Sequence, residues 1–130
     1  MAVKATWSDG SSKKILALLD TGAEVNLVNP RVMDPHLFQT ASRPVKLGVA
    51  KSHLLKGGGR ETTMVLTLAG MELDTGREQD ISLPVTAYDG EVVSDLILSY
   101  GWLAEHQAVV NPMRHGMHFL GEKMPIGYLG

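Results

Sequence analysis

Cysteine is missing from the 130-residue chain. Its absence excludes disulfide bonds, iron–sulfur clusters, zinc sites built on thiolates and a cysteine nucleophile. Because cysteine usage is the usual record of an oxidising or reducing compartment, the sequence carries no signal about that compartment.

Long apolar runs are missing as well. The longest one near the start, residues 15–19, is far shorter than the ~18 residues of a membrane span or the ~7 of a signal-peptide core. We therefore expect no membrane partner and no targeting segment.

Aromatic residues and net charge are both scarce. The chain has two Trp, three Tyr and two Phe, and its formal net charge is −2, with 9 basic and 4 acidic residues in the first 60 positions against 3 and 10 in the rest. A nucleic-acid-binding surface usually combines a basic stripe with interleaved aromatic residues, whereas the basic residues here are scattered. We expect no nucleic-acid partner, and a scaffold that docks on nucleic acid through its basic first half is the weakest alternative.

The residues that are present are those of one folded domain. Hydrophobic residues make up 44% and charged residues 20% of the chain. This balance is typical of a globular protein, and the length lies well below the ~250 residues at which chains usually divide. We expect a single domain over residues 1–130.

Period-two alternation predicts two hairpins. Val3, Ala5 and Trp7 alternate with polar residues, and turn-forming residues 8–11 separate them from the apolar run at 15–19. Residues 63–68 alternate in the same way, and residues 81–88 have the pattern of a returning strand after a polar turn. Pro84 in the returning strand indicates an edge position.

The last third of the chain predicts short elements. Residues 92–98 have the composition of an apolar strand, and residues 100–107 are the only stretch with a helical pattern. Further strands are expected at residues 109–110 and 117–120. Many short strands with one short helix favour a mostly-β, closed, barrel-like sheet.

The most informative segment is residues 17–28, ALLDTGAEVNLV, which places Asp20 between two apolar runs. We expect these runs to bury the Asp20 carboxylate in a region of low dielectric constant. Gly22 permits close approach of the backbone, and Thr21 can fix the loop by hydrogen bonding.

The tripeptide Asp-Thr-Gly occurs a second time, at residues 74–76, in different surroundings. Its neighbours are polar, which is typical of an exposed hairpin end. We therefore interpret Asp74 as an ordinary turn residue.

The five histidines do not predict a metal site. His36, His53 and His106 are isolated, and His115 and His118 would point to opposite faces of a strand. We expect neither a metal nor a cofactor.

Residues 18–25, LLDTGAEV, resemble the active-site signature of retroviral and retrotransposon aspartic proteases. A second match follows in the expected order: residues 95–103, DLILSYGWL, resemble the apolar strand and short helix that close this protease fold, especially in gypsy-type retrotransposon members. Residues 105–110 continue the similarity. Ordered matches of this kind are much more specific than a single tripeptide.

A third match concerns the family's flap, the hairpin that closes over the substrate. Residues 45–51 resemble its first arm and residues 54–57 its return arm, with the tip expected either at residues 51–53 or at the triple glycine of residues 57–59. In all, the resemblance extends over about residues 13–120.

The resemblance implies an all-β retropepsin fold, a small closed barrel with one short C-terminal helix, assembled as a two-fold homodimer. It implies an aspartic endopeptidase that hydrolyses extended polypeptide, as in polyprotein processing. The implied catalytic residues are Asp20, Thr21 and Gly22. The implied substrate-binding residues are Gly22, Ala23, Glu24, Val49, Ala50 and Lys51.

The dimer also follows from the number of carboxylates. The chemistry needs two that face each other, and the chain offers one well-framed candidate, so the second must come from another copy.

Ser99 departs from the family pattern, because it stands where the family usually has a glycine after the apolar strand. An added side chain beside a tightly packed loop costs on the order of 1–3 kcal/mol through overpacking. The alternative function is therefore a catalytically inactive module of the same fold that dimerises or binds peptides.

Overall fold

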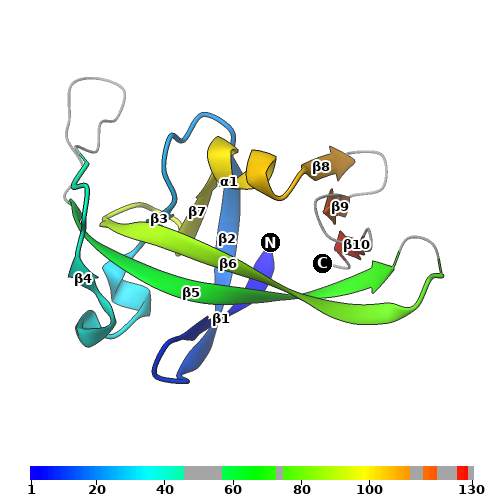
Figure 1. The fold of residues 1–130 in the computed structure, drawn as a ribbon, viewed down its shortest axis with the longest axis horizontal. Coiled ribbons are helices and arrows are strands. Elements are labelled where there is room, and N and C mark those ends of the chain that lie inside the picture. Colours follow the sequence, from blue (N-terminus) through cyan, green and yellow to red (C-terminus); the bar gives the residue numbers. More distant parts are fainter. Residues whose placement is uncertain (46–56, 73–74, 112–115, 120–125, 129–130) are drawn as a thin grey trace.

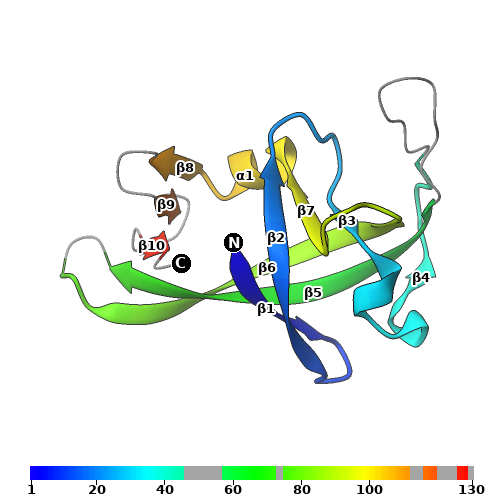
Figure 2. The same ribbon diagram turned by 180° about the vertical axis from the view of Figure 1, so that it is seen from behind.

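The computed structural model describes residues 1–45, 57–72, 75–111, 116–119 and 126–128. Its architecture is mostly β with one short α-helix, as the sequence predicts (Figures 1 and 2). In chain order the elements are β1 (Ala2–Trp7), β2 (Ser12–Asp20), β3 (Leu27–Val28), the 3₁₀ helices η1 (Pro30–Val32) and η2 (Pro35–Leu37), β4 (Gln39–Thr40), β5 (Gly57–Glu72), β6 (Glu78–Gly90), β7 (Leu96–Ser99), α1 (Tyr100–Glu105), β8 (Ala108–Asn111), β9 (Gly116–Phe119) and β10 (Ile126–Tyr128).

Six of these strands close into a barrel. Going round it, β1 pairs with β2, β2 with β7, β7 with β3, β3 with β6, β6 with β5, and β5 again with β1. Within the described residues, β4 and β10 each pair with β5, and β9 and β8 continue from β10. The expectation of a closed, barrel-like sheet is confirmed.

The amino-terminal hairpin forms as predicted. Strands β1 and β2 are antiparallel, and the turn between them is closed by the backbone N–H of Trp7, which donates to the carbonyl oxygen of Ser11 at 2.9 Å. Val3, Ala5 and Trp7 are buried, because alternate side chains of a strand point to the same face.

The second hairpin, β5 and β6, is the longest pairing in the fold and runs across the molecule in Figure 1. Pro84 lies opposite Val65 and directs its carbonyl oxygen away from β5, where it accepts from Nε1 of Trp102 at 3.1 Å. Strand β3 joins β6 only at Tyr88 and Asp89 among the described residues. Pro84 therefore lies in a stretch of β6 that, within the described residues, has β5 as its one strand partner, in line with the predicted edge position.

Strand β7 is shorter than the sequence predicts. It begins at Leu96, so the expectation of a strand from residue 92 is wrong. Residues 92 and 93 are held by side chains instead of a strand partner: Asn29 Nδ2 donates to the carbonyl oxygen of Val92 at 2.6 Å, and Arg31 Nη2 to that of Val93 at 2.9 Å. The helix α1 follows β7 directly, as expected. Among the described residues, no helix is long and apolar enough to cross a bilayer.

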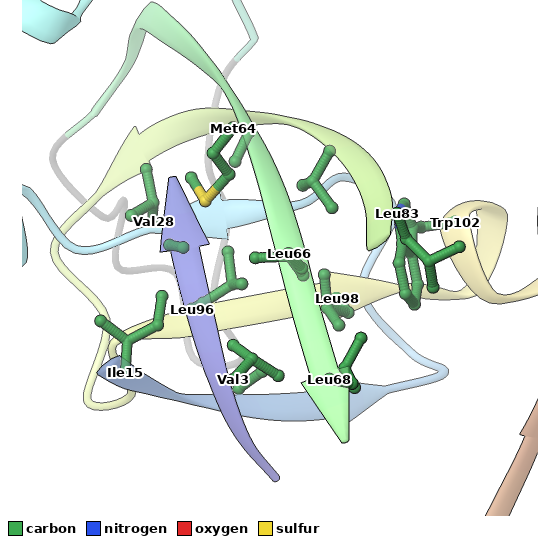
Figure 3. Packing of buried hydrophobic residues seen from close by; sticks show 14 of the residues in the cluster. Val3, Ile15, Val28, Met64, Leu66, Leu68, Leu83, Leu96, Leu98 and Trp102 are labelled. Atoms are coloured by element: carbon green, nitrogen blue, oxygen red, sulfur yellow. The ribbon is translucent and has the colours of Figure 1, made fainter. Parts of the chain in front are cut away.

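The core lies inside the barrel, where side chains from all six barrel strands converge (Figure 3). Leu66, Leu96 and Leu98 are completely buried, and Trp102 of α1 packs against the same cluster. Burial of each large apolar side chain contributes about 1.5–3 kcal/mol relative to its exposure. This cluster fixes the positions of β2 and β7, whose carboxyl ends carry the candidate site.

Candidate functional site

Asp20 is the last residue of β2, next to the end of β7. The two strands are parallel, and the register pairs Leu19 with Leu98 and Asp20 with Ser99. The loop that leaves β2 lies beside α1 in both ribbon views (Figures 1 and 2). Two segments that are far apart in the sequence, and that the resemblance had singled out separately, thus meet at one end of the sheet.

Backbone hydrogen bonds set the orientation of the Asp20 carboxylate. The N–H of Gly22 donates to Asp20 Oδ1 at 2.9 Å, and the N–H of Ala23 donates to the Asp20 carbonyl oxygen at 3.1 Å. A Cβ atom at Gly22 would lie 3.3 Å from Asp20 Oδ1, tighter than ordinary van der Waals contact. The glycine therefore lets the backbone approach the carboxylate closely, as the sequence indicates.

The site is more open in the single chain than the sequence predicts. Asp20 and Ala23 are half-buried, whereas Thr21, Gly22 and Glu24 are exposed. The expectation that the apolar runs bury the Asp20 carboxylate is met only in part. Strand β2 alternates, so that Ile15 and Ala17 point into the core while Leu16 and Leu18 are 62% and 49% exposed. One end of the barrel thus offers a carboxylate on an accessible loop.

An apolar row adjoins this carboxylate. Ile97 of β7 is the register partner of both Leu18 in β2 and Leu27 in β3. Register partners on neighbouring strands point to the same face, and Asp20, two residues after Leu18, shares that face. An apolar side chain of a bound peptide could pack on this row next to the carboxylate.

A hollow of about 400 Å³ continues from the row and is lined in part by Leu16, Leu18 and Val93. Asp95 and Arg31 also line it, and their side chains form an ion pair with 3.7 Å between Arg31 Nη2 and Asp95 Oδ1. Asp95 Oδ2 accepts from the N–H of Leu16 at 3.0 Å. The sequence reasoning missed this bridging role of Asp95, since nothing in its local pattern reveals a partner in β2.

Ser99 is buried next to Asp20. Its side chain is the N-cap of α1, where Oγ accepts from the N–H of Trp102 at 3.3 Å. A serine hydroxyl at this position satisfies one of the free N–H groups of a helix start. The structure thus gives the Ser99 side chain a local function at the start of the helix, and the expected overpacking stays a prediction.

Asn26 is a second residue that the sequence reasoning missed. It interrupts the apolar residues 25–28 and is half-buried next to Ser99, whose N–H donates to Asn26 Oδ1 at 2.8 Å. The sequence did contain a signal for this role, namely a side-chain amide inside an apolar run. Such a polar group must find a hydrogen-bond partner once it is buried.

The predicted flap is described only at its base. Val49, Ala50 and Lys51 lie outside the described residues, as does the possible tip at residues 51–53. Val45 and Gly58 join the two sides, with the N–H of Val45 donating to the carbonyl oxygen of Gly58 at 3.0 Å.

The alternative tip at residues 57–59 is wrong, because Gly57 begins β5. Here the buried carboxylate of Asp89 holds the strand: its Oδ1 accepts from the N–H groups of Gly58 at 2.9 Å and Arg60 at 3.1 Å. The backbone of Gly57 and Gly58 has positive φ, which explains the glycines in this strand.

The second Asp-Thr-Gly lies at the turn between β5 and β6. Asp74 is outside the described residues, but Thr75 and Gly76 close the turn as expected: Thr75 Oγ1 donates to Glu72 Oε2 at 2.7 Å, and the N–H of Gly76 to the Glu72 carbonyl oxygen at 2.9 Å. Across the described part of the chain, no three histidine, aspartate or glutamate side chains gather in a way that could hold a metal ion.

Neither a family model nor a curated protein sequence matches the chain. Among solved structures, it is similar to the retroviral protease-like domain of Ddi1 from Leishmania major, with 17% sequence identity and a TM-score of 0.58. The similarity covers 97% of this chain and 92% of that chain. At this identity the likeness shows the fold alone, and that fold is retropepsin-like.

Proposed function

We propose that the protein is an aspartic endopeptidase whose site forms when two copies of Asp20 meet across a two-fold homodimer. The observation that carries the proposal is the place of Asp20: it ends β2 of a retropepsin-like fold, and the N–H of Gly22 orients its carboxylate. A carboxylate held in this way on an accessible loop is suited to chemistry at the surface where two copies would join.

The homodimer supplies the second carboxylate. Asp20 is the one candidate that the sequence frames, and hydrolysis by an aspartic dyad needs two carboxylates that share a proton. Thr21 and Gly22 are exposed beside it. A two-fold axis through this loop would bring equivalent residues of both subunits together, as isologous interfaces do.

In the proposed mechanism one carboxylate is ionised and the other protonated. The ionised Asp20 accepts a proton from a water molecule, whose oxygen attacks the carbonyl carbon of the scissile peptide bond. Asp20 of the partner subunit gives its proton to the carbonyl oxygen as a tetrahedral diol forms. The C–N bond then breaks as the amine nitrogen takes a proton from the first carboxyl group, and the diol returns its proton to the second.

The substrate is an extended polypeptide with an apolar side chain close to the cleaved bond. Leu18 and Ile97, with the buried Leu27 beside them, are proposed to form the surface for that side chain, while Ala23 and Glu24 are proposed to contact the peptide backbone. Flap residues Val49, Ala50 and Lys51 are proposed to cover the peptide with strand-like hydrogen bonds. The natural substrate class that we propose is a polyprotein of a gypsy-type retrotransposon.

The alternative is an inactive module with the same fold. Its reason in the sequence is crowding by Ser99, whose hydroxyl also serves as the cap of α1. Dimerisation without cleavage nevertheless gives a distinct experimental result, so the same experiment separates the two functions.

The test is to incubate the concentrated chain with a peptide library at several pH values from about 4 to 7, where a proton-sharing dyad works. Mass spectrometry identifies the products, and sedimentation velocity gives the oligomeric state in the same buffer. Asp20→Asn is the inactivating variant. Asp34→Asn is its matched control, because Asp34 is an exposed carboxylate whose side chain makes no cap hydrogen bond.

We expect cleavage by the parent and by Asp34→Asn, and none by Asp20→Asn. A dimer that cleaves nothing would support the binding module, and a chain that stays monomeric at every concentration would contradict the shared site. Cleavage that persists in Asp20→Asn would show that another residue is responsible.

A further inference from the structure

Asn26, the residue before β3, is hydrogen-bonded to strands β6 and β7 beside the Asp20 loop. Its Oδ1 accepts from the N–H of Ser99 at 2.8 Å, and its Nδ2 donates to the carbonyl oxygen of Thr86 at 3.1 Å. Its own carbonyl oxygen accepts from the N–H of Tyr88 at 2.9 Å. Both ends of the side-chain amide and the carbonyl are therefore engaged, with partners on β6 and at the end of β7.

The bond to Ser99 continues a strand pairing that stops just before it. β3 pairs with β7 at Leu27 and Ile97, and β3 begins at Leu27. Beyond this point the Ser99 N–H has no β3 ladder partner, and the Asn26 amide oxygen takes its place. A buried backbone N–H left without a partner would be costly, so the side chain is needed there.

The Ser99 backbone is also the one beside Asp20. Ser99 is the register partner of Asp20, and the next N–H, that of Tyr100, donates to the carbonyl oxygen of Ala23 at 3.3 Å. The loop from Asp20 to Asn26 is thus joined to the β7–α1 junction at its start, middle and end. The bond that Asn26 accepts, at 2.8 Å, is shorter than the 3.3 Å bond at Ala23, and it fixes the far end of the loop.

We propose that Asn26 is the positioning residue of the Asp20 carboxylate. It acts through Ser99 and the loop and does not touch substrate. Its effect on catalysis rests on the proposed endopeptidase function, whereas its effect on the loop does not. Misplacement of a reacting group by about 1 Å can cost about 10²-fold in rate, so a fixed loop end matters for a site that must align two carboxylates.

The chemistry of the amide makes Asn26→Asp the sharpest variant. The carboxylate has the same shape and keeps an acceptor for Ser99, but it has no donor for the Thr86 carbonyl oxygen and places negative charge against it. Asn26→Leu removes both hydrogen bonds at similar size. Thr86→Ala is the matched control, because it removes a neighbouring exposed side chain and leaves the Thr86 carbonyl oxygen in place.

Two sets of measurements test the proposal. The first is kcat, KM and the pH profile of kcat on a peptide that the parent cleaves. Each variant is measured at a concentration where sedimentation shows that it has the parent's oligomeric state and circular dichroism shows that it is fully folded. We expect Asn26→Asp and Asn26→Leu to lower kcat about 10–100-fold with KM changed less than about threefold. Thr86→Ala should match the parent. If the two Asn26 variants lose kcat and also show a comparable rise in KM, the positioning role is contradicted.

The second set needs no activity. In the parent, a scalar coupling through the hydrogen bond between Ser99 N and Asn26 Cγ should be detectable by NMR, and its absence would overturn the proposal even if both variants fail to fold. In folded Asn26→Leu, amide hydrogen exchange at Ser99, Tyr100 and Gly22 should accelerate at least about tenfold, with core amides such as that of Leu66 unchanged.

The two sets separate the possible failures. A parent that cleaves nothing ends the endopeptidase proposal, while the coupling and the exchange rates still decide whether Asn26 holds the loop. An active parent whose Asn26 variants keep full kcat would overturn the positioning role alone.

Discussion

Asp20 and Ser99 are register partners at the end of the parallel strands β2 and β7. One carries the candidate carboxylate, and the other starts α1 with its side chain. This pairing puts the cap of the helix, the loop after β2 and the amide of Asn26 within one hydrogen-bonded group. The stability of this end of the barrel and the geometry of the carboxylate are therefore linked.

Ser99 should behave as a helix cap. We expect Ser99→Ala to lower the free energy of unfolding by about 1 kcal/mol and Ser99→Gly by only a few tenths, since glycine is tolerated at this position of a helix. Denaturant unfolding at one fixed protein concentration measures both, because any self-association adds to apparent stability. A glycine variant that is more stable than the parent by 1 kcal/mol or more, in line with relief of overpacking, would show that the serine crowds the loop after all.

The glycines at the start of β5 should differ sharply from one another. Gly57 has φ +131°, and a Cβ atom there would lie 2.1 Å from the Asp89 carbonyl oxygen, whereas nothing lies within 4 Å of a Cβ at Gly59. We expect Gly57→Ala to destabilise the fold by more than about 1 kcal/mol, since backbone strain alone costs about 1–3 kcal/mol. Gly59→Ala should stay within about 0.5 kcal/mol of the parent. Equal melting curves for the two variants would argue against the described path of the chain.

Two leucines on opposite faces of the barrel wall give a test of the core. Leu66 is completely buried and Leu16 is 62% exposed. Leu66→Ala should lower the free energy of unfolding by about 2–5 kcal/mol, because it removes apolar contacts and leaves a cavity. Leu16→Ala should change it by less than about 0.5 kcal/mol. Chemical denaturation of both variants decides this, and a large loss at Leu16 would mean that its face is covered in solution.

The pKa of Asp9 should lie below its ordinary value. Its carboxylate accepts from the hydroxyl and the N–H of Ser11 and lies 3.2 Å from Nε2 of His36. These contacts, with the Ser11 hydroxyl first, lower the pKa of Asp9 because they favour its charged form. A lowered pKa in the folded state stabilises the fold at neutral pH, and this contribution is lost as the pH falls through the folded-state pKa.

Carboxyl-carbon NMR across the acidic range measures the Asp9 titration. We expect Ser11→Ala to move the pKa of Asp9 upward, toward its ordinary value. Ser12→Ala, an exposed neighbour, serves as the control. If the titration of Asp9 is the same in parent and Ser11→Ala, the hairpin turn does not have this hydrogen-bonding pattern in solution.

Local patterns in the sequence were sufficient for most of the barrel. Alternation at Val3, Ala5 and Trp7, and again along β5 and β6, determined which faces enter the core, because a strand repeats every two residues. The motif at Asp20 and Gly22 likewise specified a close turn, since its hydrogen bond spans only two residues.

Other features depended on partners far away in the sequence. The strand expected from residue 92 is replaced by a loop that Asn29 and Arg31 hold through their side chains. Half of the apolar run before Asp20 faces outward, because β2 is one layer of a barrel wall and has only one side toward the core.

The residues of this chain therefore determined by themselves its mostly-β character, its two hairpins and the position of a carboxylate at the end of β2, since each follows from contacts within a few residues. The tertiary structure alone decided that Ser99 caps a helix and that Asn26, 73 positions before it, completes the pairing beside Asp20. A side-chain amide or hydroxyl can form many hydrogen bonds, and only the closure of the barrel brings one donor and one acceptor within reach.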